Sequence, residues 1–301
     1  MNPVLQLHNI SDIDSFLNSK VRHPLVEVVD FSKIDEQIEE GTRISCDFYM
    51  IMFKNYCANK VRYGRKSYDF QDGSLACIAP KQVLTMDTEI EKKEDKMGWG
   101  LFFHPDLIRG TSLGAKMKDY TFFSYETNEA LHLSGKEKQV LYDIVQKINA
   151  ELGENIDQHS QTLITSNIEL LLNYCTRYYD RQFITRKISN QDVLGKIETA
   201  LTGYFQSGDI SEKGLPTVKY LAEQVHLSSN YLSDLLKRET GMNAKDRIHY
   251  YLIEEAKNML LNTNKTIGEL AFDLGFEYPQ YFSRLFKSKT GTTPLEYRSA
   301  N

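Results

Sequence analysis

The sequence has few cysteines and histidines, and their spacing does not match the common disulfide and metal motifs. Its four cysteines are scattered among 301 residues: Cys46, Cys57, Cys77 and Cys175. None of them forms a C-x-x-C pair, which indicates reduced thiols in a cytoplasm rather than a disulfide framework or a zinc site. Three histidines are similarly isolated: His8, His23 and His104. Because a metal-dependent enzyme needs clustered ligands, we expect no metal, no cofactor and no enzymatic activity.

Long apolar runs and an excess of positive charge are also missing. No apolar stretch approaches the roughly 18 residues that a membrane span needs. The first residues, MNPVLQLHNISDIDSF, lack the basic and apolar regions of a secretion signal. We therefore expect a cytoplasmic protein without a membrane partner. The net charge is −5, and residues 191–301 carry 13 Lys and Arg against 14 Asp and Glu. Contact with a nucleic acid would depend on local basic clusters near the carboxy terminus.

The length of the chain predicts about two domains, and the amino-terminal one has the pattern of a β domain. From about residue 20 to residue 130, short β-branched or aromatic segments alternate with turn residues: LVEVVDF, CDFYMIMF, VRYG, SYDF, SLACIAP and GWGLFF. Many short strands with turn signals predict a small β-barrel or sandwich. The segment DGSLACIAPKQV, residues 72–83, predicts a hairpin followed by a strand that ends at Pro80.

Two helices are predicted after the strands, at about residues 135–180. Ser134 and Glu137 have the spacing of a capping box, which opens a helix that runs to about Leu152 and stops at Gly153. The second helix, about residues 156–179, carries one apolar stripe: Leu163, Ile164, Ile168, Leu171, Leu172 and Cys175. Packing inside the domain is one interpretation of this stripe. The other is a dimer seam made by Ile164, Ile168, Leu171 and Leu172. Residues 180–191, DRQFITRKISNQ, are polar and predict an interdomain linker, so the domains are residues 1–185 and 186–301.

The last third of the chain contains two helix-turn-helix patterns in tandem, and the first covers residues 218–241. Thr217 is placed to cap a helix over residues 218–225, and Ser228 to cap the next one. Tyr231, Leu232, Leu235 and Leu236 supply the buried face of that second helix. The opposite face carries the predicted base-reading residues: Asn230, Ser233 and Asp234. Lys237 and Arg238 lie one turn further on, where they suit phosphate contacts.

The second pattern, residues 266–291, repeats this plan. Gly275 is a turn residue that tolerates positive φ, and Pro279 suits the first turn of the next helix. The outward face of that helix carries further predicted base readers: Gln280, Ser283 and Arg284. Arginine pairs best with guanine, whereas glutamine pairs with adenine. Lys287 and Lys289 follow as predicted phosphate contacts.

Residues 244–261 predict a helix that joins the two patterns. Eighteen residues at about 1.5 Å each give a rod of roughly 27 Å. With the width of the flanking helices added, the two recognition helices would lie about 34 Å apart, which is one turn of B-DNA. Both would then enter successive major grooves of double-stranded DNA. A helical bundle without a DNA role is the alternative, but the shared turn, cap and basic end of the two patterns favour DNA reading.

Residues 200–298 resemble the AraC/XylS family of bacterial transcription regulators. The resemblance rests on LAEQVHLSSNYLSDLLKRETG, on EEAKNMLL and on the signature region GFEYPQYFSRLFKSKTGTTPLEYR. It implies that the six base-reading positions named above have that role in this chain. Two departures from the family pattern are notable: Leu252 stands where the family often has Arg, and Tyr278-Pro279 where small polar residues are common.

The resemblance also implies an α+β chain, with an amino-terminal cupin-like β-barrel and helical pair followed by an all-α carboxy-terminal domain. In this family the first domain often binds an effector and dimerises through helices. A homodimer, a small-molecule effector and a contact with RNA polymerase are therefore the partners implied besides DNA. Three residues of VRYGRKSYDF could line an effector pocket: Tyr63, Arg65 and Tyr68. An exposed hairpin is the alternative interpretation of that segment.

The sequence thus predicts a sequence-specific, DNA-binding transcription regulator. Two alternatives stay open at this point. One is a cupin-type enzyme with a vestigial helical tail, which the missing histidine cluster disfavours. The other is a regulator that has no effector and is controlled by its abundance or by a protein partner. The sequence does not distinguish an activator from a repressor.

Overall fold

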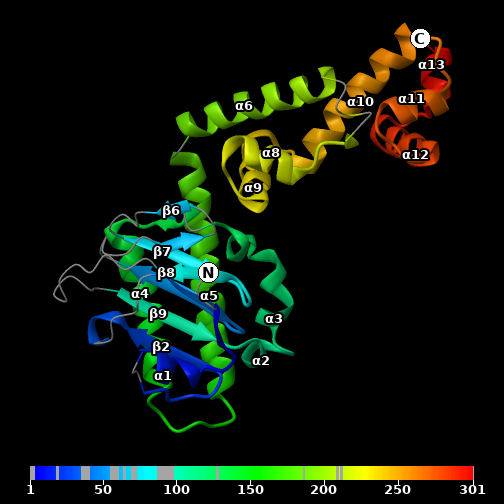
Figure 1. Ribbon diagram of the computed structural model, residues 1–301. Coiled ribbons are helices and arrows are strands. Elements are labelled where there is room, and N and C mark those ends of the chain that lie inside the picture. The colour runs from blue at the N-terminus through cyan, green and yellow to red at the C-terminus, as the bar shows by residue number, and fades with distance from the viewer. Residues whose placement is uncertain are drawn as a thin grey trace. The chain divides into compact units, whose positions relative to one another are not determined.

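The chain forms two compact units, Met1–Thr185 and Arg186–Asn301. The computed structural model describes residues 4–17, 20–34, 41–54, 61–63, 66–68, 73–86, 98–126, 129–185, 187–207, 210 and 213–300. Within these ranges, no helix is both long enough and apolar enough to cross a membrane. We describe the two units separately (Figure 1).

The first unit contains two five-stranded sheets. The first sheet has the order β1-β3-β8-β5-β6, with β1 at Val4–Leu7, β3 at Thr42–Cys46, β8 at Val83–Met86, β5 at Val61–Tyr63 and β6 at Lys66–Tyr68. The second has the order β10-β7-β4-β9-β2, with β10 at Leu131–His132, β7 at Ser74–Ile78, β4 at Tyr49–Lys54, β9 at Gly98–Phe103 and β2 at Val26–Asp30. Neighbouring strands pair in antiparallel fashion except β1 and β3, which are parallel.

The two sheets pack face to face around a shared apolar core. Ile44 and Leu84 come from the first sheet, and Met50, Ile78 and Phe102 from the second. Their alternation along each strand follows from the period of two that places successive side chains on opposite faces. In the described residues no strand pairing joins one sheet to the other, so the architecture is an open sandwich and no closed barrel is seen.

The strands of the segment at residues 72–83 do not form the predicted hairpin. β7 pairs with β4 and β10, whereas β8 pairs with β3 and β5, so the chain changes sheets between them. The change takes place at Pro80 and Lys81, and Lys81 adopts a positive φ of 69°. The strand that the sequence predicts to end at Pro80 is β7, which ends at Ile78, but in the described residues β7 pairs with neither of the strands next to it in the chain.

Short helices connect the strands of this unit, and two long helices follow them. The short ones are α1 (Asp12–Leu17), η1 (Phe31–Lys33), α2 (Pro105–Ile108), α3 (Ser112–Lys116), η3 (Met117–Asp119) and η4 (Thr121–Ser124). The long ones are α4 (Gly135–Glu151) and α5 (Ser160–Thr185), which pack against each other. α4 also contacts β2, and α5 contacts β10, so the pair lies along the second sheet. The capping box predicted at Ser134 and Glu137 is confirmed.

The apolar stripe of α5 is buried inside this unit. The four residues considered as a dimer seam are at most 1% exposed: Ile164, Ile168, Leu171 and Leu172. The structure therefore assigns these side chains to internal packing, because a second copy could not reach them. Leu163, which belongs to the same sequence pattern, is 48% exposed.

The predicted bounds of the second long helix and of the linker differ from the structure. α5 begins at Ser160 because the Asp157 carboxylate accepts hydrogen bonds from the backbone N–H groups of His159 and Ser160, at 2.7 and 3.0 Å. At its other end α5 continues to Thr185, and α6 (Lys187–Gln206) begins two residues later. The boundary between the two units falls after Thr185, inside the linker predicted at residues 180–191, and the described residues of that segment are helical. That segment contains neither Gly nor Pro, so its polar composition does not interrupt a helix.

The second unit is entirely helical in its described residues. After α6 come α8 (Val218–Val225), α9 (Ser229–Thr240), α10 (Ala244–Asn262), α11 (Ile267–Asp273), α12 (Pro279–Thr290) and α13 (Pro294–Ala300). They enclose two apolar cores. Leu221, Leu232 and Leu236 belong to the first core, and Phe282 and Phe286 to the second. The α10 helix contributes side chains to both cores.

Three cysteines are buried free thiols: Cys46, Cys77 and Cys175. Cys57 lies outside the described residues. Burial is the main reason that the pKa of Cys46 rises to about 12, with nearby carboxylates adding to the effect. A thiol of this kind stays protonated and is a poor nucleophile.

Candidate nucleic-acid interface

The first helix-turn-helix is built by two side-chain caps and one left-handed turn. The Thr217 hydroxyl accepts a hydrogen bond from the N–H of Tyr220 at 3.1 Å, which starts α8. His226 ends α8 with φ 57° and ψ 42°, a conformation that Asn, Asp and His adopt more readily than other non-glycine residues. The Ser228 hydroxyl accepts from the N–H of Tyr231 at 3.2 Å and starts α9. Both predicted caps are therefore present.

The α9 helix buries one face and presents the other. Its four apolar residues are at most 3% exposed: Tyr231, Leu232, Leu235 and Leu236. On the other side Asn230 is exposed, and Ser233 and Asp234 are half-buried. Lys237 and Arg238 are exposed in the last turn. The predicted base readers and phosphate contacts of this half thus reach the surface of the unit.

The second helix-turn-helix is built by an equivalent helix cap and turn. Thr266 and Glu269 form a capping box at the start of α11. Their hydrogen bonds keep the pKa of the Glu269 carboxyl below its ordinary value, chiefly through the backbone N–H of Thr266. Gly275 has φ 74° in the turn, and Pro279 occupies the first turn of α12. A side chain at Gly275 would meet the carbonyl oxygen of Ile210 at 2.7 Å, so glycine is needed for space as well as for its backbone conformation.

The α12 helix has the same division of faces. Phe282 and Phe286 are fully buried. Gln280, Arg284 and Lys287 are exposed, and Ser283 is half-buried. These four residues occupy the outward face that the sequence predicts.

The sequence did not predict that two aromatic residues form an exposed pair at the start of α12. Tyr278 is 47% exposed and Tyr281 is 55% exposed, and their rings meet edge to face with centroids 5.8 Å apart. They lie next to Gln280 on the same helical turn. Tyr281 could have been found from its spacing, because it lies three residues before Arg284 and so shares its face.

The α10 helix joins both halves through one continuous backbone. Its first part places Ala244 and Ile248 in the first core, and its later part places Leu252, Ala256 and Leu260 in the second. Leu252, the position where the resembled family often has Arg, is fully buried here. The aromatic residues Phe205 and Tyr220 also pack against both cores. The two halves are therefore parts of one packed body.

Comparison with known proteins matches this part of the chain. Residues 221–300 match the family model described as a helix-turn-helix domain. The transcriptional regulator YisR of Bacillus subtilis is 35% identical over 82 residues, which is 27% of this chain and 29% of YisR. YfiF of the same organism is 29% identical over 163 residues, 54% of this chain and 48% of YfiF. The carboxy-terminal domain of the response regulator yesN from Fusobacterium nucleatum is 35% identical, with 30% of this chain and 91% of that domain covered and a TM-score of 0.27.

The carboxy-terminal unit is an AraC/XylS-type helix-turn-helix domain. The matched segments span less than half of the length of YisR and of YfiF, both of which are named as uncharacterised regulators.

Two basic residues of the AraC-type domain have structural partners. The Lys289 ammonium lies 2.9 Å from the Asp246 carboxylate on α10, and this contact is the main reason for the lowered pKa of Asp246. The Arg298 Nε donates to the carbonyl oxygen of Leu260 at 3.0 Å. Lys289 thus connects α12 to α10, and because it is also exposed its role as a phosphate contact stays a prediction. Lys287, two residues earlier, is exposed.

Two of the residues predicted for the effector pocket, Tyr63 and Tyr68, end the strands β5 and β6, which pair with each other in antiparallel fashion. Arg65 and the side chains of Tyr63 and Tyr68 lie outside the described residues. His104 is the N-cap of α2, where its Nδ1 accepts from the N–H of Asp106 at 3.2 Å. Within the described ranges, no three His, Cys, Asp or Glu side chains are grouped so that they could hold a metal ion.

Proposed function

We propose that this chain is a sequence-specific transcription regulator whose α9 and α12 helices enter successive major grooves of double-stranded DNA. The observation that carries the proposal is the repeated design of the AraC-type domain. Each half has a capped helix with a buried apolar back and an exposed polar front, and α10 ties both halves together. A helix of this kind is the DNA-reading element of helix-turn-helix proteins.

The exposed side chains have the chemistry that base reading needs. A guanidinium group such as that of Arg284 donates two hydrogen bonds to the O6 and N7 atoms of guanine. Amides such as those of Asn230 and Gln280 pair in the same bidentate way with adenine. At the edge of these faces lie the other three proposed base readers: Ser233, Asp234 and Ser283. Lys237, Arg238 and Lys287 supply the phosphate contacts.

The length of α10 supports simultaneous contact by both halves. Its 19 residues at about 1.5 Å each give a rod of roughly 28 Å. Successive major grooves on one side of B-DNA are about 34 Å apart. The bodies of α9 and α12 flank the rod and make up the difference.

The first unit has the regulatory role in this proposal, and the chain has no enzymatic activity. We propose that its two-sheet sandwich senses an effector, which is the role that the family resemblance implies for the amino-terminal domain. A homodimer in the cytoplasm and a contact with RNA polymerase complete the proposed mode of action. Because Ile164, Ile168, Leu171 and Leu172 are buried within the first unit, we propose that the dimer uses other residues.

The test is binding of the full-length protein to fragments of its genome, followed by one substitution in each half. Arg284→Ala should weaken binding to the selected fragment by about 1–3 kcal/mol, because a bidentate base contact is lost. Asn230→Ala should have an effect of similar size in the other half. The matched control is Arg109→Ala, which removes an exposed arginine of the first unit.

Quantitative gel shifts at fixed salt give the comparison, because phosphate contacts make affinity strongly salt-dependent. Equal affinities of wild type, Arg284→Ala and Asn230→Ala would refute the proposed reading faces. Loss of binding in Arg109→Ala as well would show that DNA contacts lie elsewhere.

A further inference from the structure

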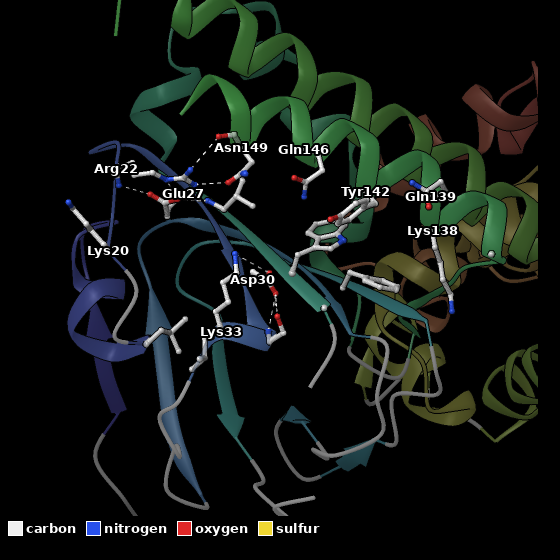
Figure 2. A pocket seen from close by; sticks show the side chains of 18 residues that line it. Lys20, Arg22, Glu27, Asp30, Lys33, Lys138, Gln139, Tyr142, Gln146 and Asn149 are labelled. Atoms are coloured by element: carbon white, nitrogen blue, oxygen red, sulfur yellow. Dashed lines mark hydrogen bonds and ion pairs between the residues drawn. The ribbon is translucent and has the colours of Figure 1, made fainter. Parts of the chain in front are cut away.

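A groove of about 880 Å³ lies in the first unit between α4 and the strands β2 and β9 (Figure 2). Charged side chains of its lining pair with one another: Arg22 with Glu27, and Lys33 with Asp30. Figure 2 shows these four side chains at the groove. Its apolar lining includes Leu17, which also belongs to the core between the two sheets. Because these contacts are internal to the protein, the groove does not single out one class of ligand.

The exposed aromatic pair of the AraC-type domain, Tyr278 and Tyr281, presents apolar surface to the outside instead. The two residues are 47% and 55% exposed. Exposed apolar groups that lie together commonly mark a contact surface, and tyrosine is enriched at such surfaces. The pair lies at the start of α12, which is the helix that the proposed function places in a major groove. Its position therefore points to a contact with DNA.

The corresponding tyrosine of the first half has a different environment. Both α9 and α12 are helices of 12 residues, and a tyrosine is the third residue of each. Tyr231 of α9 is only 3% exposed, whereas Tyr281 of α12 is 55% exposed. The same residue type at the equivalent position thus packs inside the domain in one half and lies at the surface in the other.

Tyr278 occupies a position that usually carries a small polar residue. It is the N-cap of α12, and its side chain makes no hydrogen bond to the first turn of this helix, all of which the structure describes. In the first half the Ser228 hydroxyl caps α9. Serine, threonine, asparagine and aspartate are preferred at N-caps because they accept from free backbone N–H groups. The chain forgoes this local stabilisation at Tyr278, and such departures from a local rule are expected at functional sites.

The two rings are held in a defined arrangement. They meet edge to face, with centroids 5.8 Å apart and planes at 86°, which is a favourable geometry for aromatic rings. Tyr278 has an extended backbone, as a residue before proline prefers, and Pro279 fixes the first position of α12. Tyr281 lies three residues before Arg284 and shares its face. The pair is therefore a preorganised apolar surface beside an exposed guanidinium group.

In a major groove this apolar surface has one chemical complement. The base edges there present hydrogen-bond donors and acceptors, together with the C5-methyl group of thymine. A recognition helix contacts base edges with its N-terminal residues, and Tyr278 and Tyr281 lie at that end of α12. Gln280 and Arg284 supply hydrogen bonds, so the tyrosine rings add a contact that these polar side chains cannot make.

We propose that Tyr278 and Tyr281 read thymine, by packing their rings against the C5-methyl group of at least one thymine in the major groove that α12 enters. The inference rests on the proposed function and deepens it. It requires thymine in the base segment that the second half reads. The first half, where the equivalent tyrosine is buried, has no such requirement.

The experiment uses the full-length protein and the genomic fragment that the gel shifts select. Each thymine of the bound segment, located by footprinting, is replaced in turn by deoxyuridine, which pairs in the same way and lacks only the C5-methyl group. We expect binding to weaken by about fourfold at one position or more, because a methyl group is lost from an apolar contact. The difference between thymine and uracil should vanish in the double variant Tyr278→Ala/Tyr281→Ala. Both residues are exposed, so this variant should fold normally.

Two further variants are the controls. Tyr250→Ala removes another exposed tyrosine, which also meets a neighbouring ring edge to face but lies on α10. It should keep the difference between thymine and uracil. The double variant Tyr278→Phe/Tyr281→Phe retains the rings without their hydroxyl groups, so it should keep the difference as well.

Three outcomes would overturn the proposal. One is DNA binding that is indifferent to every uracil and to the alanine double variant, which would assign the pair to a protein partner. Another is a methyl effect that survives in the alanine double variant. The third is a methyl effect that is lost in the phenylalanine double variant, because the hydroxyl groups would then make the contact. If any of these occurs while Arg284→Ala weakens binding, only the thymine inference fails, whereas a protein that binds no fragment refutes the proposed function as well.

Discussion

Substitution of Leu252 by alanine tests whether α10 is the structural centre of the DNA-binding unit. Leu252 is fully buried in the second apolar core, next to residues of α11 and α12. Truncation of a buried leucine removes apolar contacts and leaves a cavity, which costs about 2–5 kcal/mol. We expect about 3 kcal/mol, because α10 is packed on both sides and cannot easily move into the space. The free energy of unfolding of the second unit should fall by that amount.

The position of the single tryptophan allows the two units to be followed separately. Trp99 is the only tryptophan of the chain and lies in β9 of the first unit. Its fluorescence therefore reports unfolding of the first unit, whereas the helical circular dichroism signal includes all helices of the second. In urea, Leu252→Ala should lower the midpoint of the part of the dichroism transition that belongs to the second unit. The fluorescence midpoint should stay unchanged.

The control is Tyr250→Ala, two residues away on the same helix. Tyr250 is 52% exposed, and substitutions at such surface positions usually change stability by less than about 0.5 kcal/mol. An equally small effect of Leu252→Ala would refute the packing described for α10. A fluorescence midpoint that moves together with the dichroism midpoint would refute the assignment of this effect to the second unit alone.

Two further predictions concern the second helix-turn-helix. Gly275→Ala should destabilise the unit clearly more than Gly291→Ala does. Both glycines have positive φ, which costs a non-glycine residue about 1–2 kcal/mol. Of the two, only Gly275 has backbone atoms where the added methyl group would lie. Urea unfolding of the two variants measures the difference in stability. The Glu269 carboxylate should stabilise this unit at pH values above 4.5, which is its ordinary pKa. Because its pKa is lowered in the folded state, that contribution is lost as the pH falls through the lowered value. The stability difference between wild type and Glu269→Gln should accordingly shrink in acid, and a constant difference from neutral pH to about pH 3 would contradict the capping-box assignment.

The helix-turn-helix halves could be predicted closely because their signals are local. Thr217 and Ser228 each cap a helix that starts at the next residue, and both predicted caps required only the neighbouring sequence. The division of α9 and α12 into buried and exposed faces follows from the period of 3.6 residues in the same way.

Features that depend on distant residues could not be predicted. Lys289 is paired with Asp246, 43 positions earlier in the chain, and no local pattern indicates this contact. The assignment of β7 and β8 to different sheets is equally non-local. The groove between α4 and β2 combines residues from Leu17 to Asn149, and no short motif marks it.

The helix boundaries at the junction of the two units could not be predicted for a different reason. The polar composition of residues 180–191 predicted an interdomain linker, but it did not indicate that the described residues of this segment are helical, because backbone conformation depends on helix propensity and on breakers rather than on polarity. The bounds of α5 and α6 leave only Arg186 between them.

The continuity of α10 constrains the operators that this domain could recognise. Because one uninterrupted helix is embedded in both apolar cores, neither half can shift along the duplex without breaking backbone hydrogen bonds or opening a core. In the proposed function, α10 therefore fixes the distance between the two recognition helices. The separation between the two base segments of a target should accordingly be the same in every operator. Regulators with a longer or shorter α10 would need operators with a different separation, so the two lengths should vary together during evolution.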